Sequence, residues 1–224
     1  MTVSGNDITD SGTDRGVHDR LLDVAERLFC ESGFDGTSIR DLTTAAECNV
    51  ASVNYHFGGK DKLYLEVFRR RMLIMRDLRI ASINNVMSQH GREVSLERLL
   101  HAFVSSFIQP LVSETSAGRF SKLMAREMFE PHLPRNVLLE EMIIPVVSSL
   151  QQALAKVCPD LEQKRAVLCV HSLIAQLIHT IRTREVFGGL DDVRLPAADL
   201  SGMVEHIVEF SAAGIRAAAG RKSQ

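Results

Sequence analysis

Residues 37–60, TSIRDLTTAAECNVASVNYHFGGK, contain two short helical patterns separated by a tight break, and this stretch constrains the fold most. In its second half Val50, Val53 and Phe57 recur at spacings of three and four, so they are predicted to face inward. The outward face then carries small, amide, phenol and imidazole side chains, which is unusual for a helix that only has to be soluble. The major groove of DNA admits one helix, and such side chains can hydrogen-bond base edges or phosphates there. The pattern predicts a helix-turn-helix that contacts DNA.

Local signals set the expected limits of these two helices. Thr37 or Ser38 can cap the first helix, and Asp41 in its first turn suits the positive end of the helix dipole. Asn49 can cap the second helix, and a Gly-Gly pair follows it. We therefore expect two compact helices joined by a turn of a few residues.

The string NYHFGGKDKLY (residues 54–64), with SIRDLTTAA (38–46) before it, resembles the DNA-binding domain of the TetR family of transcriptional repressors. The resemblance covers about residues 16–70. It implies an all-α fold with an N-terminal three-helix helix-turn-helix domain and a larger C-terminal helical bundle that senses a ligand. The family usually has a small residue, often Gly, in the turn where this chain has Glu47. If that position needs a positive φ, Glu47 carries a strain of about 1 kcal/mol.

A second resemblance lies further along the chain. LMAREMFEP (123–131) and EEMIIPV (140–146) are similar to the C-terminal domain of the CecR-type branch of the TetR family, over about residues 95–215. This implies a regulatory domain after the DNA-binding domain.

The chain is expected to divide into three parts: a disordered arm at 1–14, the helix-turn-helix domain at 15–62, and a ligand-binding and dimerisation domain at 63–224. A long helical pattern over 60–90 would link the two domains. Later helices are predicted at 120–131, 135–157, 160–183 and 199–219, separated by loops at 111–119 and 188–198. Pro145 lies inside the second of these helices, where it either kinks the helix or starts a new one.

Matched position by position, the TetR resemblance implies which residues contact DNA. Arg40 suits a bidentate bond to guanine, and Ala51 suits contact with a thymine methyl group. Phosphate contacts would fix the register of the protein on the duplex, while base contacts would read the sequence. The predicted DNA-binding residues are Thr37, Ser38, Arg40, Asn49, Ala51, Ser52, Asn54, Tyr55, His56 and Lys60.

The middle helices mix Phe and Met with a few polar side chains, as small-molecule cavities do, although plain core has the same spacing. The resemblance favours a pocket here for an unidentified effector. Its predicted residues are Phe103, Phe107, Met124, Arg126, Met128, Met142, His171 and Gln176.

Composition narrows the class of protein. The net charge is −2, and residues 15–71 hold nine Lys or Arg and nine Asp or Glu, so non-specific affinity for DNA should be modest. The four cysteines form no CxxC pair, as expected for reduced thiols in a cytoplasmic protein. We find no run of about 18 apolar residues and no secretory signal pattern. Catalytic and metal-binding motifs are also missing from the sequence, so we expect neither an enzyme, nor a cofactor, nor a metal site.

The two long helices at 160–183 and 199–219 are apolar over more than one face, which favours a homodimer through an intermolecular four-helix bundle. The function predicted is a ligand-responsive transcriptional regulator, a repressor, that binds palindromic operator DNA as a homodimer and is released by a small molecule. An all-α small-molecule-binding or protein-interaction module with a non-functional helix-turn-helix stays open as an alternative. The sequence leaves open whether a ligand releases or promotes DNA binding.

Overall fold

A computed structural model of the chain describes residues 10–89, 94–112, 120, 123–124, 126–127, 130–187 and 200–220. Every regular element in these residues is helical, which confirms the all-α prediction. The elements are α1 (Asp10–Ser32), α2 (Ile39–Ala45), α3 (Ala51–Phe57), α4 (Lys60–Gln89), α5 (Leu96–Val112), α7 (Arg135–Leu138), the π-helix η1 (Leu139–Ile143), α8 (Ile144–Val157), α9 (Gln163–Phe187) and α10 (Leu200–Ala219).

The chain divides into two compact units. The N-terminal unit comprises Met1–Arg71 and Lys122–Leu133, and the C-terminal unit comprises Met72–Ser121 and Pro134–Gln224. The predicted boundary after residue 62 therefore moves to residue 71, inside α4, and a later segment joins the N-terminal unit.

One predicted irregular stretch also changes. Residues 10–14 of the predicted arm form the first turns of α1. Residues 1–9, most of the predicted loop at 111–119, and the loop at 188–198 lie outside the described residues.

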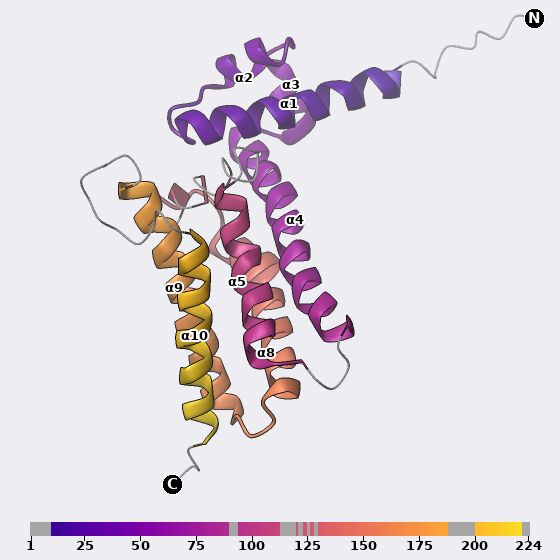
Figure 1. Ribbon diagram of the computed structural model, residues 1–224. Helices are drawn as coiled ribbons and strands as arrows, with labels where there is room; N and C mark the ends of the chain where they lie inside the picture. Colours follow the sequence, from indigo (N-terminus) through magenta and orange to yellow (C-terminus); the bar gives the residue numbers. More distant parts are fainter. Residues whose placement is uncertain are drawn as a thin grey trace, which may run out of the picture. The chain divides into compact units, whose positions relative to one another are not determined.

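The core of the N-terminal unit is built from the apolar faces of α1, α2, α3 and the first turns of α4. Figure 1 shows α1–α3 grouped together. The fully buried side chains include Leu21, Phe29, Leu42, Val53, Leu63 and Phe68. Because α2 and α3 each have only seven residues, they depend on this packing rather than on helix propensity.

In the C-terminal unit α5, α8, α9 and α10 run beside one another as a bundle (Figure 1). Its core includes Leu99, Phe103, Leu150, Leu177 and Ile207. Asn136–Val157 and Gln163–Thr183 are long and apolar enough to cross a membrane by length and composition, contrary to the sequence expectation. Core helices of soluble proteins pass the same test, and both stretches supply side chains to this core.

The π-helix follows from Pro145, which stands in the first turn of α8. Proline has no N–H, so the carbonyl of Glu141 cannot receive the usual α-helical bond from position 145. The N–H of Ile144 instead reaches back five residues to the carbonyl of Leu139. Arg76 Nη1 donates to the Glu141 oxygen at 3.4 Å. The expected kink or new start is thus a π turn followed by a new α-helix, joined to α4 by Arg76.

Candidate nucleic-acid interface

The start of α2 is fixed by a capping box. Ser38 Oγ accepts the Asp41 N–H at 3.1 Å, and the Asp41 carboxylate accepts the Ser38 N–H at 3.0 Å and its hydroxyl at 2.6 Å. These hydrogen bonds from Ser38 lower the pKa of Asp41. Of the two caps considered from the sequence, Ser38 is the one formed, and its hydroxyl is held by that cap.

Thr37 is buried instead. Its hydroxyl donates to the carbonyls of Gly33 at 2.8 Å and Leu28 at 3.2 Å, and the residue is only 2% exposed. The phosphate contact predicted for Thr37 is therefore wrong: the side chain anchors the turn after α1. Gly33 in that turn has a φ of 76°, as suits a glycine ending a helix.

The turn between α2 and α3 is a Schellman motif. The Cys48 N–H donates to the Thr43 carbonyl at 3.0 Å, and the Glu47 N–H donates to the Thr44 carbonyl at 3.3 Å. Glu47 has a φ of 51°, in the left-handed region that favours glycine. The sequence predicted strain at Glu47 if this position has a positive φ. The φ is positive, so Glu47 is held in a strained backbone conformation. Arg20 of α1 supports the same turn by donating from Nε to the Ala46 carbonyl at 3.4 Å.

Asn49 sets the start of α3. Its Oδ1 accepts the Ala51 N–H at 2.9 Å, and its carbonyl accepts the Ser52 N–H at 2.9 Å. Val50 occupies the helix cap position without a side-chain bond. It is 53% exposed, so the prediction that it faces inward is wrong.

The outward face of α3 holds the polar set expected from the sequence. Val53 and Phe57 are buried, while Ala51, Asn54 and Tyr55 are exposed. Tyr55 is 76% exposed although it is aromatic. The helix ends at Gly58, with a φ of 72°. This short helix therefore presents an amide and a phenol to solvent from a rigidly capped frame.

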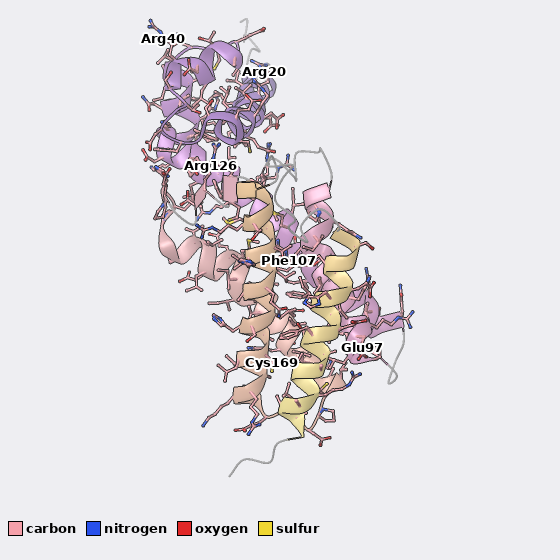
Figure 2. All side chains as sticks on the ribbon, turned by 60° about the vertical axis from the view of Figure 1, so that its left-hand side comes forward. Arg20, Arg40, Glu97, Phe107, Arg126 and Cys169 are labelled. Carbon is pink, nitrogen blue, oxygen red and sulfur yellow. The ribbon has the colours of Figure 1, made fainter. Side chains whose placement is uncertain are left out.

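Residues around α3 complete the candidate interface. Arg40 is exposed on α2, and its side chain points away from the unit (Figure 2). Ser52 and His56 are half-buried. His18 of α1 stacks on Phe57, with ring centroids 4.6 Å apart. Lys60 Nζ lies 4.1 Å from the centroid of Phe34.

The segment 122–133 contributes a buried carboxylate, Glu127, whose bond to Tyr64 the sequence did not predict. Glu127 accepts the Tyr64 hydroxyl at 2.9 Å and the N–H groups of His132 and Leu133 at 2.6 and 2.5 Å. Burial, together with the Glu127 charge, raises the pKa of Tyr64 well above its ordinary value. The His132 ring packs on Phe34, with centroids 4.5 Å apart. The Glu127 carboxylate thus binds the segment to α4, and the His132 ring packs it against the turn after α1.

A cavity of about 260 Å³ lies in the same place. It is lined by the turn after α1, by Tyr64 and by residues of the 122–133 segment. Arg126, labelled in Figure 2, lines it together with Glu31, Asp35 and Glu130. No group of three metal-ligating side chains occurs among the described residues.

The predicted effector residues are divided between the two units. Met124 and Arg126 belong to the N-terminal unit, whereas Phe103, Phe107 and Met142 belong to the C-terminal unit. The effector set therefore stays a prediction.

The remaining predicted effector residues lie elsewhere. His171 is exposed on α9. Gln176 Nε2 donates to the Ser172 carbonyl at 3.4 Å and to Ser211 Oγ of α10 at 3.3 Å, so its amide joins the two helices. Met128 lies outside the described residues.

Comparison with known proteins assigns both regions. Residues 21–67 match the domain described as bacterial regulatory proteins, tetR family. Residues 96–215 match the C-terminal domain of the HTH-type transcriptional dual regulator CecR, which is more than half of the chain.

Individual proteins agree with this assignment. The chain is 26% identical to CecR of Shigella flexneri over 171 residues, 71% of this chain and 73% of that protein. It is 37% identical to the biofilm operon icaADBC negative transcriptional regulator IcaR of Staphylococcus epidermidis over 48 residues, 21% of this chain and only 26% of IcaR. In fold it is similar to the regulator FadR of Bacillus subtilis, solved in complex with stearoyl-CoA, with a TM-score of 0.66 and 13% identity over 88% of this chain and 99% of that one. The chain belongs to the TetR family of transcriptional regulators, with a C-terminal domain of the CecR type.

Proposed function

We propose that the protein is a cytoplasmic repressor that binds a palindromic operator as a homodimer and is released by a small-molecule effector. The observation that carries the proposal is the exposed polar face of α3 on a frame fixed by a capping box, a Schellman turn and a buried core. Two relatives support it: IcaR is described as a negative transcriptional regulator and CecR as a dual transcriptional regulator. FadR, which shares the fold, was solved with a small molecule bound.

Within this proposal the outward side chains have different roles. Asn54 and Arg40 read bases. An amide can form two hydrogen bonds with adenine, and a guanidinium group can form two with guanine. Tyr55 and Lys60 contact phosphates and set the register. The packing of Lys60 on Phe34 restrains the lysine near the start of α4.

The dimer is proposed to form through α9 and α10. Val167 and Leu168 of α9 are exposed, the latter by 66%, and Phe210 of α10 is 63% exposed. Exposed apolar groups of this size on two adjacent long helices are typical of an interface. A second copy of the chain packed on this face would complete a four-helix bundle.

The coupling of effector to operator is proposed to run through α4. This helix begins beside α3 in the sequence and continues into the C-terminal unit. We consider two conformations of the dimer that differ in where α4 lies. An effector that binds one of them more tightly would change the spacing of the two α3 helices and so lower the affinity for the operator.

The test is selection of the purified protein against a random duplex library at near-physiological salt. A palindrome is the expected product. Asn54→Ala should relax the preference at one position per half-site at a cost of about 1–3 kcal/mol. Lys60→Ala should weaken binding to all duplexes alike and lower the salt slope by about one per half-site.

Two results would count against the proposal. A folded dimer that enriches no sequence would favour the alternative, an all-α binding module with a non-functional helix-turn-helix. The strain at Glu47, in the turn between the two helices of the motif, is the structural feature that favours that alternative. A selection profile unchanged by Asn54→Ala would remove this residue from base readout.

A further inference from the structure

Arg79 of α4 is a buried arginine without a counter-ion among the described residues. It is 4% exposed, and its Nε has no hydrogen-bond partner. Arg70 and Arg71 are less buried, with side chains 31% and 23% exposed, yet both bind the carboxylate of Glu26. The most buried of these guanidinium groups is thus the one without a carboxylate.

An aromatic ring forms one wall around this group. The Arg79 guanidinium carbon lies 3.6 Å from the centroid of Phe107 on α5. Phe107 packs against Phe103, with ring centroids 5.0 Å apart, and Phe103 is fully buried. Figure 2 shows Phe107 within the helices of the C-terminal unit. A planar cation stacked on an aromatic ring is held in place while its N–H groups at the edge stay open to a further ligand.

The π turn lies close to the same face of α4. Arg76 stands three residues before Arg79, so the two side chains lie on the same side of the helix. Arg76 contacts the Glu141 carbonyl in η1, and Met142 of η1 is buried. Single π turns within helices occur frequently at functional sites. Arg79 therefore lies against α5 and about one helical turn from the arginine that contacts η1.

A lone buried cation opposes folding. Removal of a guanidinium group from water costs free energy unless an anion and hydrogen bonds compensate it. Burial lowers the pKa of Arg79 to about 9, so the group stays cationic at neutral pH, with the Phe107 ring but no carboxylate of the described residues against its charge. A methionine would fill a similar volume without this cost. An anion that arrives from outside would compensate this cost.

We propose that Arg79 is the anion-binding group of the effector site, and that the effector is an organic carboxylate whose apolar body packs along Phe107. The inference rests on the proposed function, since it names the chemical class of the effector. The carboxylate would form two parallel hydrogen bonds with the edge of the guanidinium group. Phe107, which is half-buried and backed by the fully buried Phe103, would supply the apolar wall that ligand cavities usually have.

The first experiment needs no ligand. Arg79→Met is compared with wild type by thermal unfolding, with the exposed Arg98→Met as matched control. If Arg79 awaits an anion, Arg79→Met should raise Tm by roughly 2–6 °C, because an uncompensated buried charge is removed, while Arg98→Met leaves Tm almost unchanged. A lower Tm for Arg79→Met would show that the arginine is a structural group and would overturn the proposal.

The second experiment uses decanoate and phenylacetate, each paired with an uncharged counterpart, decanol and phenylacetamide. The two acids separate aliphatic from aromatic carboxylates. At least one acid should raise the Tm of wild type more than its counterpart does, and Arg79→Met should weaken its binding by roughly 10–100-fold. Arg79→Lys keeps the charge but loses the planar pair of N–H donors. Its affinity for the acid should therefore lie between those of wild type and Arg79→Met. Failure of both acids to stabilise wild type, or equal stabilisation of Arg79→Met, would refute the assignment.

Operator binding separates this inference from the proposed function. Arg79→Met should still bind the selected operator but should no longer be released by the acid. If wild type selects no operator, the proposed function fails whatever the acids do. If it selects one and the acids act equally on wild type and Arg79→Met, only the role of Arg79 is wrong.

Discussion

Replacement of Glu47 by glycine should stabilise the N-terminal unit, because Glu47 has a φ of 51°. A left-handed conformation costs a residue with a side chain about 1–2 kcal/mol. Glycine avoids that cost, but its greater freedom in the unfolded chain takes back about 0.5–1 kcal/mol. The net gain expected for Glu47→Gly is about 0.5–1 kcal/mol. The free energy of unfolding of a small unit falls by about 1 kcal/mol per molar urea. The urea concentration at the midpoint of unfolding should therefore rise by about 0.5–1 M.

The sequence supplies a signal specific to this unit. It contains no tryptophan and two tyrosines, Tyr55 and Tyr64, both in the N-terminal unit. Tyr64 is buried and bonded to Glu127, so tyrosine fluorescence in a urea titration reports the unfolding of this unit.

Matched variants separate the backbone from the charge. Glu47→Gln removes the charge but keeps the strain, and its midpoint should stay near that of wild type. Glu47→Asn should lie between the two, because asparagine tolerates the left-handed region better than most residues. If Glu47→Gln gains as much stability as Glu47→Gly, the strain argument is refuted and the gain comes from charge.

Three further predictions concern the same unit. Gly36→Ala should destabilise it by about 1–3 kcal/mol in the same titration, because a Cβ at this position would lie 2.4 Å from the Ser32 carbonyl oxygen; an unchanged midpoint would contradict this. Glu127→Ala should cost about 3 kcal/mol or more, since the Tyr64 hydroxyl and two backbone N–H groups lose their acceptor; Glu127→Gln, which keeps one acceptor oxygen, should cost less, and equal losses would argue against the network. Asp41 has a lowered folded pKa, so its cap contributes fully above the ordinary value of 3.8 and is lost as pH falls below it. The stability gap between wild type and Asp41→Asn should therefore be present at pH 6 and shrink in acid, and a gap independent of pH would exclude the carboxylate as its source.

Local patterns predicted α2 and α3 well because the relevant contacts are close in sequence. Val53 and Phe57 are spaced for one helical face, and both are buried. The periodicity failed at Val50, which precedes the first helical residue and so does not share that face. Thr37 and Ser38 could not be told apart as caps, because both have a hydroxyl and only the burial of Thr37 decides between them.

The rest of the site depends on contacts between distant residues. Tyr64 and Glu127 are 63 positions apart, and neither has a local pattern that announces the pair. Nothing in the sequence distinguishes Arg79 from other arginines on a long helix. Its contact with Phe107 is seen only in the structure. The pairing of a buried charge with a ring from another helix is set by tertiary packing, which periodicity does not encode.

The division of the chain bears on how its parts could be exchanged in protein engineering. The N-terminal unit is assembled from two separate stretches, Met1–Arg71 and Lys122–Leu133, whereas the family resemblance of its DNA-reading part ends at residue 67. A chimera that transplants only the first stretch would take Tyr64 away from the carboxylate of Glu127. A successful graft must carry both stretches, or choose a recipient whose own later segment offers an equivalent acceptor. In this chain the unit that contains the helix-turn-helix therefore depends on a stretch that lies within the CecR-type C-terminal match.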